Sequence, residues 1–265
     1  RVKLLGFYWF NKKWDEATPH LIWLIENHPD IDLLAWEVSQ IGDLSKDKVL
    51  FDTIRLSWEE KLKQFPANPS ILTNAAAFYL GSDRRRTIEL LQKALKVSDN
   101  PESILFNLSQ TYEKEIGFDR KNGLISEALV VQEKVAQLNE NNVGVLTFLA
   151  LLYLYKGELE KAKEYSEKSL MFIEADGESL LNARAHCVRG LIYLEEGNMG
   201  NAQKELLEQG TYPVFELANK LIEHGELDIV KQYVKNNVEY WDISKVTYSK
   251  WITMLNMGLK PRLEH

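Results

Sequence analysis

Cysteine and long apolar runs are the two features that this sequence most clearly lacks. Cys187 is the single cysteine among 265 residues, so no disulfide can form within the chain and cysteine usage gives no indication of its compartment. No stretch approaches the roughly 18 consecutive apolar residues of a membrane-spanning helix, so we expect no membrane span. The chain begins at Arg1 rather than Met, and we expect that residues upstream would decide between a cytoplasmic and an exported protein.

Positive charge is also in short supply. The 32 Lys and Arg residues face 39 Asp and Glu residues, and the formal net charge of −7 argues against nucleic acid or an anionic membrane as the main partner. The sharpest basic run is Arg84, Arg85 and Arg86. It could bind an anion or an acidic partner, because the start of a helix also attracts negative charge. The alternative is that these arginines form a solvated helix face.

Catalytic and metal-binding motifs are missing as well. The sequence contains no GxSxG, Walker loop, dinucleotide fingerprint or HExxH. His20, His28, His186 and His224 lack the spacing of metal ligands. His186 and Cys187 are adjacent, so on a helix they point in different directions and cannot form a nucleophile pair. We therefore expect no enzymatic activity, no metal and no cofactor.

Helical periodicity is clearest in residues 143–175, which predict two antiparallel helices joined at Lys156-Gly157-Glu158. Gly157 tolerates the left-handed backbone that ends a helix, and Glu158 places negative charge where the next helix begins. The apolar and small residues that recur at helical spacing are Leu146, Leu149, Ala150 and Tyr153, then Leu159, Ala162, Tyr165 and Ser169.

This unit resembles a tetratricopeptide repeat. Seven residues occupy positions of the repeat pattern: Leu146, Leu149, Ala150, Tyr153, Gly157, Ala162 and Ser169. The small residues Ala150 and Ala162 let the two helices approach closely, and Tyr153 fills the space beside them. One such hairpin cannot bury its own apolar face, so neighbouring hairpins are expected on both sides.

Similar units precede and follow the central one. Units begin at residues 68 and 102, separated by the 34-residue period of this repeat class. The first has its turn at Ser82-Asp83, and we expect Asp83 to cap the helix that follows. The second contains an insertion at 117–123 that we expect to form a loop. A fourth unit begins at 183, with Arg189 where Leu is expected, and a degenerate fifth covers 214–234. The sequence therefore predicts an all-α, right-handed α-solenoid of about five hairpins.

The ends of the chain differ from this array. Trp9, Trp14, Trp23, Trp36 and Trp58 precede the repeats, Trp241 and Trp251 follow them, and none falls between. Terminal hairpins have one neighbour only, so aromatic end caps are expected. We predict a helical N-terminal region (1–66), including a short helix at Leu33–Val38, then a repeat array (67–240) and a C-terminal capping helix (241–262). Residues 263–265 look like a tag remnant.

Several segments are also similar to one uncharacterised bacterial family of repeat-containing proteins. They are LLGFYWF, HLIWLIENHPD, the run from Trp58 through FPANPSILTNAAAFYLGSD, and ELANKLIEHGELDIVKQYVKNNVEYW with Trp251 and Gly258-Leu259-Lys260-Pro261. The resemblance covers nearly the whole chain. It implies an all-helical repeat fold and a bacterial source, and it transfers no catalytic residue.

The first helix of each hairpin is expected to line a groove. The inward-facing positions are Leu72, Ala76, Tyr79, Phe106, Gln110, Glu113, Thr147, Leu151, Leu154, Cys187, Leu191 and Leu194. This groove lacks the Lys, Asn and Arg set of the tetratricopeptide domains that grip acidic chaperone tails. An apolar groove could receive an amphipathic helix or an extended segment of a partner protein.

These residues predict a non-enzymatic scaffold that binds a protein or peptide. Three alternatives stay open at this stage. The groove residues could simply pack beneath a neighbouring helix or the N-terminal region. The tryptophans of the N-terminal region could line a pocket for a small ligand or a reaction. Exposed apolar faces could instead mediate self-association.

Overall fold

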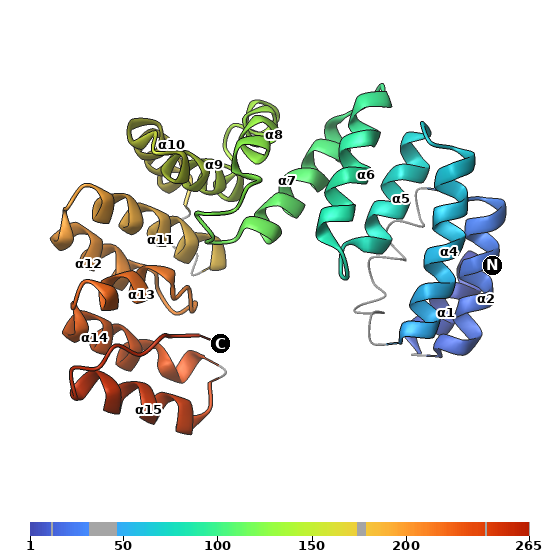
Figure 1. The fold of residues 1–265 in the computed structure, drawn as a ribbon. Coiled ribbons are helices and arrows are strands. Elements are labelled where there is room, and N and C mark those ends of the chain that lie inside the picture. The colour runs from blue at the N-terminus through green and yellow to red at the C-terminus, as the bar shows by residue number, and fades with distance from the viewer. Residues whose placement is uncertain (12, 32–46, 174–178, 242, 265) are drawn as a thin grey trace. The chain divides into compact units, whose positions relative to one another are not determined.

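The computed structural model describes residues 1–11, 13–31, 47–173, 179–241 and 243–264, and it contains no β-strand within these ranges (Figure 1). Fourteen α-helices and one 3-10 helix make up this described part of the chain, which confirms the all-α fold class. The predicted short helix at Leu33–Val38, with Trp36, lies outside the described residues, as do the link 174–178 and the side chain of Trp9.

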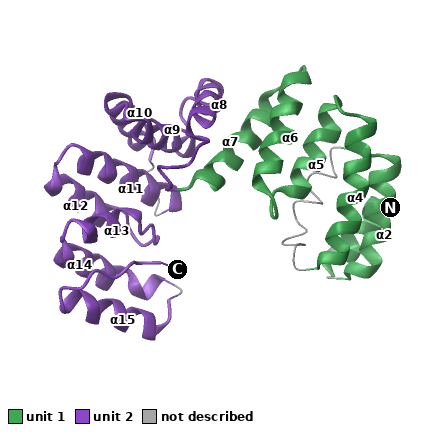
Figure 2. Ribbon diagram, in the orientation of Figure 1, with its two compact units in different colours: residues 1–117 green, residues 118–265 purple. Residues whose placement is uncertain are grey.

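The chain divides into two compact units, residues 1–117 and residues 118–265 (Figure 2). The boundary falls at the start of the insertion that interrupts the second predicted repeat. The sequence predicts a different kind of division, into an N-terminal region, a repeat array and a capping helix, which is based on similarity between hairpins. The two compact units are based on packing, so that division stays a prediction. Each unit is described by itself below.

Unit 1 is a series of helices in which each described helix packs against the next. The helices are α1 (Val2–Phe10), α2 (Trp14–Asn27), α4 (Lys48–Gln64), α5 (Pro69–Tyr79), α6 (Arg84–Val97) and α7 (Glu102–Ile116). The side chains of Asn68 and Asp83 cap α5 and α6 by accepting the amide hydrogens of Ile71 and Arg86, which confirms Asp83 as the predicted cap. The Asn74 amide ties α5 to the segment after α2 by donating to the carbonyl oxygens of Pro29 and Ile31.

Unit 2 has the nearest-neighbour packing that defines a solenoid. Its helices are α8 (Ile125–Leu138), α9 (Val143–Lys156), α10 (Leu159–Met171), α11 (Leu180–Glu195), α12 (Met199–Glu208), α13 (Glu216–Glu223), α14 (Leu227–Asn237), the 3-10 helix η2 (Val238–Tyr240) and α15 (Lys245–Asn256). Helix α9 packs against α8, α10 and α11, and α11 packs against α12 and α13. The first helices of three successive hairpins, α9, α11 and α13, therefore form one continuous layer.

The central hairpin has the structure that its sequence predicts. Asn142 caps α9 by accepting the Val145 amide hydrogen, and Gly157 ends the helix in the left-handed conformation with φ 82°. The amide of Glu158 then donates to the carbonyl oxygen of Tyr153, which closes the helix end. The six side chains at repeat positions are buried: Leu146, Leu149, Ala150, Tyr153, Ala162 and Ser169.

Packing explains two neighbouring residues of α11, Arg189 and Gly190. Arg189, which replaces an expected Leu, is only partly buried, and its guanidinium lies 3.4 Å from the Glu205 carboxylate of α12 and donates to the Tyr193 hydroxyl. The following Gly190 lies directly beneath Leu217 of α13. A β-carbon placed on Gly190 would lie 2.2 Å from Leu217 Cδ2, so the absence of a side chain sets how closely α11 and α13 approach.

Large aromatic side chains are buried in both units. Trp58 of α4 is fully buried in unit 1. In unit 2, the rings of Trp241 and Trp251 both pack edge-on against Phe215, with centroids 5.0 Å and 5.6 Å away. Leu263 is also buried, and the Asn219 side chain hydrogen-bonds both its amide and its carbonyl group.

Replacing Gly190 with Ala should destabilise unit 2 by roughly 1–3 kcal/mol, the usual cost of adding a methyl group to a packed core. Leu217 is fully buried and has little room to move away from the new side chain. Urea unfolding followed by circular dichroism measures the shift in midpoint.

Gly200 of α12 supplies the matched control, because a β-carbon there meets nothing within 4 Å. Gly200→Ala should be neutral or stabilise by about 0.4–1 kcal/mol. In the double variant Gly190→Ala/Leu217→Ala, the cost of the first substitution should shrink. Equal midpoints for Gly190→Ala and the wild type would contradict the close approach of the two helices.

Candidate functional site

A cavity of about 540 Å³ lies in unit 2 against the layer formed by α9, α11 and α13. Such a volume falls within the range of about 300–1,000 Å³ that is typical of ligand pockets. Its apolar wall consists of Leu154, Tyr155, Leu191 and Leu194. The remaining lining residues are Phe118, Asp119, Arg120, Lys121, Glu195, Glu216, Lys220, Glu223 and His224.

One side of the cavity is the loop formed by the insertion between α7 and α8. Gly117 starts this loop with a positive φ of 51°. The Asp119 carboxylate accepts the amide hydrogen of Lys121 at 3.0 Å, which tightens the turn. Arg120 then forms an ion pair with Glu195 at the end of α11. The loop is thereby fixed against the layer of first helices, where Phe118 to Lys121 add both apolar and charged surface to the cavity.

Helix α13 contributes a further part of the cavity lining. Glu216 is the first residue of this helix and is partly buried, whereas Glu223 in the last turn is exposed and forms an ion pair with Lys220 at 2.8 Å. Within the described part of the chain, no hydrogen bond or ion pair engages the Glu216 carboxylate. Burial raises the pKa of Glu216. The positive charge of Lys220 opposes this rise in part, the negative charge of Glu223 adds to it, and the charge of Arg262 opposes it.

The predicted groove residues of unit 2 fall into two groups. Leu154, Leu191 and Leu194 line the cavity. Thr147, Leu151 and Cys187 are buried and do not line it. Burial raises the pKa of the Cys187 thiol to about 12, so the thiolate is not accessible near neutral pH.

The predicted groove residues of unit 1 are distributed differently. Leu72, Ala76 and Tyr79 of α5 are buried. On α7, Phe106 and Gln110 are exposed and Glu113 is partly buried. The structure therefore brings three of the predicted residues together around a cavity in unit 2, and the groove as a whole stays a prediction.

Two groups of residues that line the cavity are not among the site residues predicted from the sequence. Residues 118–121 belong to an insertion, so an alignment of repeats passes over them, although insertions are where loops with functional side chains often occur. Glu216, Lys220 and Glu223 lie in the degenerate fifth hairpin, where the repeat positions are hard to assign.

The predicted arginine patch has carboxylate partners inside unit 1. Arg84 and Arg85 lie 3.8 Å and 3.5 Å from Glu115 of α7. Arg86 bridges Glu59 of α4 and Glu89 of its own helix, each at 3.1 Å. An anion or acidic partner would therefore meet arginines whose charge is already partly balanced, and Arg85, 74% exposed, is the most accessible of the three.

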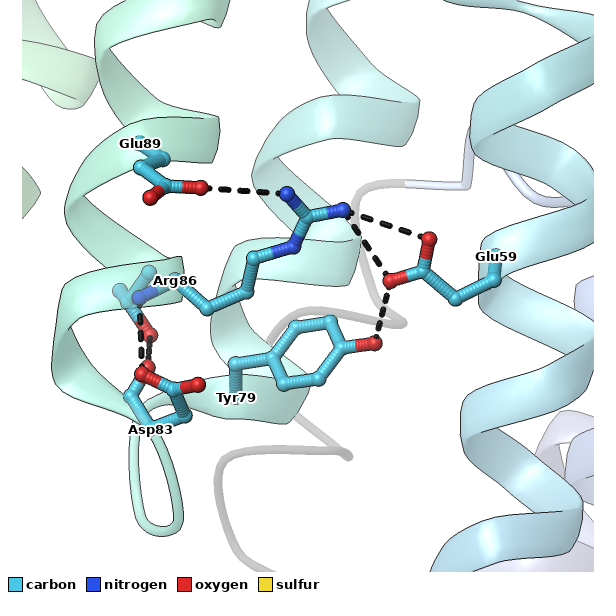
Figure 3. Close-up of polar contacts among 6 residues, drawn as sticks. Glu59, Tyr79, Asp83, Arg86 and Glu89 are labelled. Atoms are coloured by element: carbon cyan, nitrogen blue, oxygen red, sulfur yellow. Dashed lines mark hydrogen bonds and ion pairs between the residues drawn. The ribbon is translucent and has the colours of Figure 1, made fainter.

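Arg86 belongs to a polar cluster with Glu59 and Tyr79, shown in Figure 3. The Tyr79 hydroxyl donates to the Glu59 carboxylate at 2.7 Å, and the Arg86 guanidinium lies 5.9 Å from the centre of the Tyr79 ring. Burial by itself would raise the pKa of Glu59, but the hydrogen bond from Tyr79 and the charge of Arg86 outweigh it, so the pKa is lowered. The cluster joins α4, α5 and α6, and we interpret its role as holding these three helices together.

A second cavity of about 420 Å³ lies among α8, α9 and α10, and its lining is Glu133, Ala136, Gln137, Glu140, Leu146, Tyr165 and Lys168. Near it, the Tyr153 hydroxyl donates to Glu133, and the rings of Tyr153 and Tyr165 stack with centroids 5.5 Å apart. These contacts connect the two helices of the central hairpin to α8.

No group of three or more His, Cys, Asp or Glu side chains in the described ranges could hold a metal ion. His186 instead contacts Glu205 of α12 at 2.8 Å. Among the helices that the structure describes, none is both long enough and apolar enough to cross a membrane.

Comparisons with known proteins agree with the geometry. A family model of the tetratricopeptide repeat matches residues 143–176. A tetratricopeptide repeat protein from Parabacteroides merdae ATCC 43184 is 15% identical, with 96% of this chain and 97% of that chain covered and a TM-score of 0.57. The C-terminal part of a TPR repeat-containing protein from Cytophaga hutchinsonii is 13% identical, with 97% and 96% covered and a TM-score of 0.51.

A third similar structure is MamA from Desulfovibrio magneticus RS-1, which is 18% identical, with 71% of this chain and 96% of that chain covered and a TM-score of 0.48. No curated protein matches the sequence.

The chain thus has the fold of an α-solenoid built from helical hairpins. Residues 143–176 are a tetratricopeptide repeat, and the fold is that of tetratricopeptide-repeat proteins. Arrays of this class generally provide surfaces for contacts between proteins.

Replacing Glu59 with Gln should lower the free energy of unfolding by roughly 1–3 kcal/mol at pH 7, the usual range for hydrogen bonds to a charged group. Because the pKa of Glu59 is lowered in the folded chain, this stabilisation is complete above the ordinary carboxyl value of 4.5 and is lost as the pH falls through the folded-state pKa. Thermal melts across this range should show the two proteins converging in acid. The neighbouring, exposed Glu60→Gln should have little effect.

Replacing Glu216 with Gln should instead raise the Tm at pH 7. Its pKa is raised by folding, so ionisation favours the unfolded chain as the pH rises through 4.5 and the folded-state value, and the neutral amide avoids this cost. Below pH 4.5 the two proteins should melt together. Glu208→Gln, at an exposed position of α12, is the control, and a lower Tm for Glu216→Gln at pH 7 would contradict the prediction.

Proposed function

We propose that the chain is a non-enzymatic scaffold that binds a segment of a partner protein in the cavity against α9, α11 and α13. The observation that supports this proposal is the cavity itself, which lies against the first helices of three successive hairpins. Apolar side chains at Leu154, Leu191 and Leu194 would bury the partner's apolar side chains, and the charged rim would fix its orientation.

The composition of the lining favours a peptide segment. The apolar wall draws residues from two neighbouring hairpins, and the insertion loop, α11 and α13 contribute charged residues. An extended segment or a helix face can contact residues of several of these elements at once.

A peptide library tests this proposal. Random dodecapeptides displayed on phage are selected on the immobilised full chain, and the enriched peptides are synthesised and titrated by fluorescence anisotropy. Leu194→Asp introduces a carboxylate into the apolar wall and should weaken binding at least about tenfold, because burying an unpaired charge costs several kcal/mol.

Leu207→Asp is the matched control, since Leu207 is an exposed residue of α12 that does not line the cavity. This variant should bind the selected peptides as the wild type does. Circular dichroism confirms that both variants are folded. Peptides that bind the Leu194→Asp protein with wild-type affinity would refute the cavity as the binding site.

A further inference from the structure

The charged rim of the cavity is largely neutralised from within unit 2. Arg120 is paired with Glu195, and Lys220 is paired with Glu223. The Asp119 carboxylate accepts a backbone amide hydrogen in its own loop, and Lys121 is exposed to solvent. Most of the charges at the rim would therefore gain little from a new partner.

Glu216 differs from these groups. It stands at the start of α13, partly buried, and within the described residues its carboxylate has no hydrogen-bond or ion-pair partner at contact distance. It also lies among the apolar side chains that a bound segment would cover. An occupant that covered this carboxylate without supplying a positive charge would remove its remaining water and raise the cost of its charge.

We infer that the segment bound in this cavity presents a lysine or arginine side chain to Glu216, next to apolar side chains that cover Leu191 and Leu194. This inference rests on the proposed function. A cationic side chain replaces the water lost by the carboxylate with a charge-assisted hydrogen bond, whereas a neutral or acidic side chain leaves the carboxylate unpaired. The same carboxylate therefore attracts basic segments and rejects acidic ones.

An acidic segment is the competing occupant, since Arg120, Lys121, Lys220 and His224 also line the cavity. Lys121, which is exposed to solvent, could pair with it directly, but pairing with Arg120 or Lys220 would require it to displace Glu195 or Glu223. It would also bring its own negative charge close to Glu216. The existing ion pairs thus favour the basic segment.

The peptide selection is repeated on the Glu216→Gln protein, whose fold the amide should not disturb. Peptides from the wild type should be enriched in Lys or Arg beside apolar residues, and peptides from Glu216→Gln should keep the apolar residues without the basic one. Glu208→Gln, on α12 outside the cavity, should select the same peptides as the wild type.

A double-mutant cycle, with substitutions in both the protein and the peptide, then measures the interaction between Glu216 and the basic residue of the peptide. Norleucine in place of the basic residue of the best wild-type peptide should weaken its binding to the wild type about tenfold and leave its binding to Glu216→Gln nearly unchanged. Binding should also weaken in acid, as Glu216 becomes protonated. The charges of Lys220, Glu223 and Arg262 act on Glu216. The other charged and titratable groups that line the cavity are Asp119, Arg120, Lys121, Tyr155, Glu195 and His224.

The outcomes separate the inference from the proposed function. If peptides bind, Leu194→Asp abolishes binding, and the selected peptides show no basic preference or an acidic one, the inference fails and the proposed function stands. If no peptide is enriched, or Leu194→Asp has no effect, both fail.

Discussion

The structure depends on one constraint: a single helical hairpin is too thin to bury its own apolar side chains, so hairpins must stack. In unit 2, α9 contacts the hairpins before and after its own, and α11 continues the layer to α13. Gly190 allows Leu217 to approach the axis of α11. Because α13 is held at this short distance, Glu216 reaches the same cavity as Leu154 and Leu191, and the candidate site is a product of the stacking.

Two partly buried glutamates show how neighbours decide what burial does to a carboxylate. Glu59 is engaged by Tyr79 and Arg86, and its pKa is lowered although burial alone would raise it. Glu216 lacks such partners at contact distance within the described chain, and its pKa is raised. Structural clusters stabilise their charges internally, whereas binding sites often keep a charge unsatisfied at a cost in stability. This contrast is why we regard the first cluster as structural and the second residue as part of a site.

Features that depend on neighbouring residues along the chain could be predicted accurately. Asp83 caps α6 and Gly157 ends α9, because cap chemistry and a left-handed backbone are local requirements. The repeat positions of the central hairpin are buried, since a 3.6-residue period places them on one face. From repeat spacing, Leu154, Leu191 and Leu194 are predicted to face a groove, and they line the cavity. Phe106, at an equivalent predicted position in unit 1, is exposed.

The helical hairpins, their ends and their buried faces can be predicted from the sequence, because they follow from periodicity and from caps within a few residues. Which charged residues form ion pairs can be seen only in the three-dimensional structure. Arg120 and Glu195 are 75 residues apart in the sequence, and Arg84, Arg85 and Arg86 find their partners on other helices as well as on their own. Such pairings depend on loop conformation and on the angles between helices, which result from many weak contacts summed over the whole unit, and no local pattern encodes them.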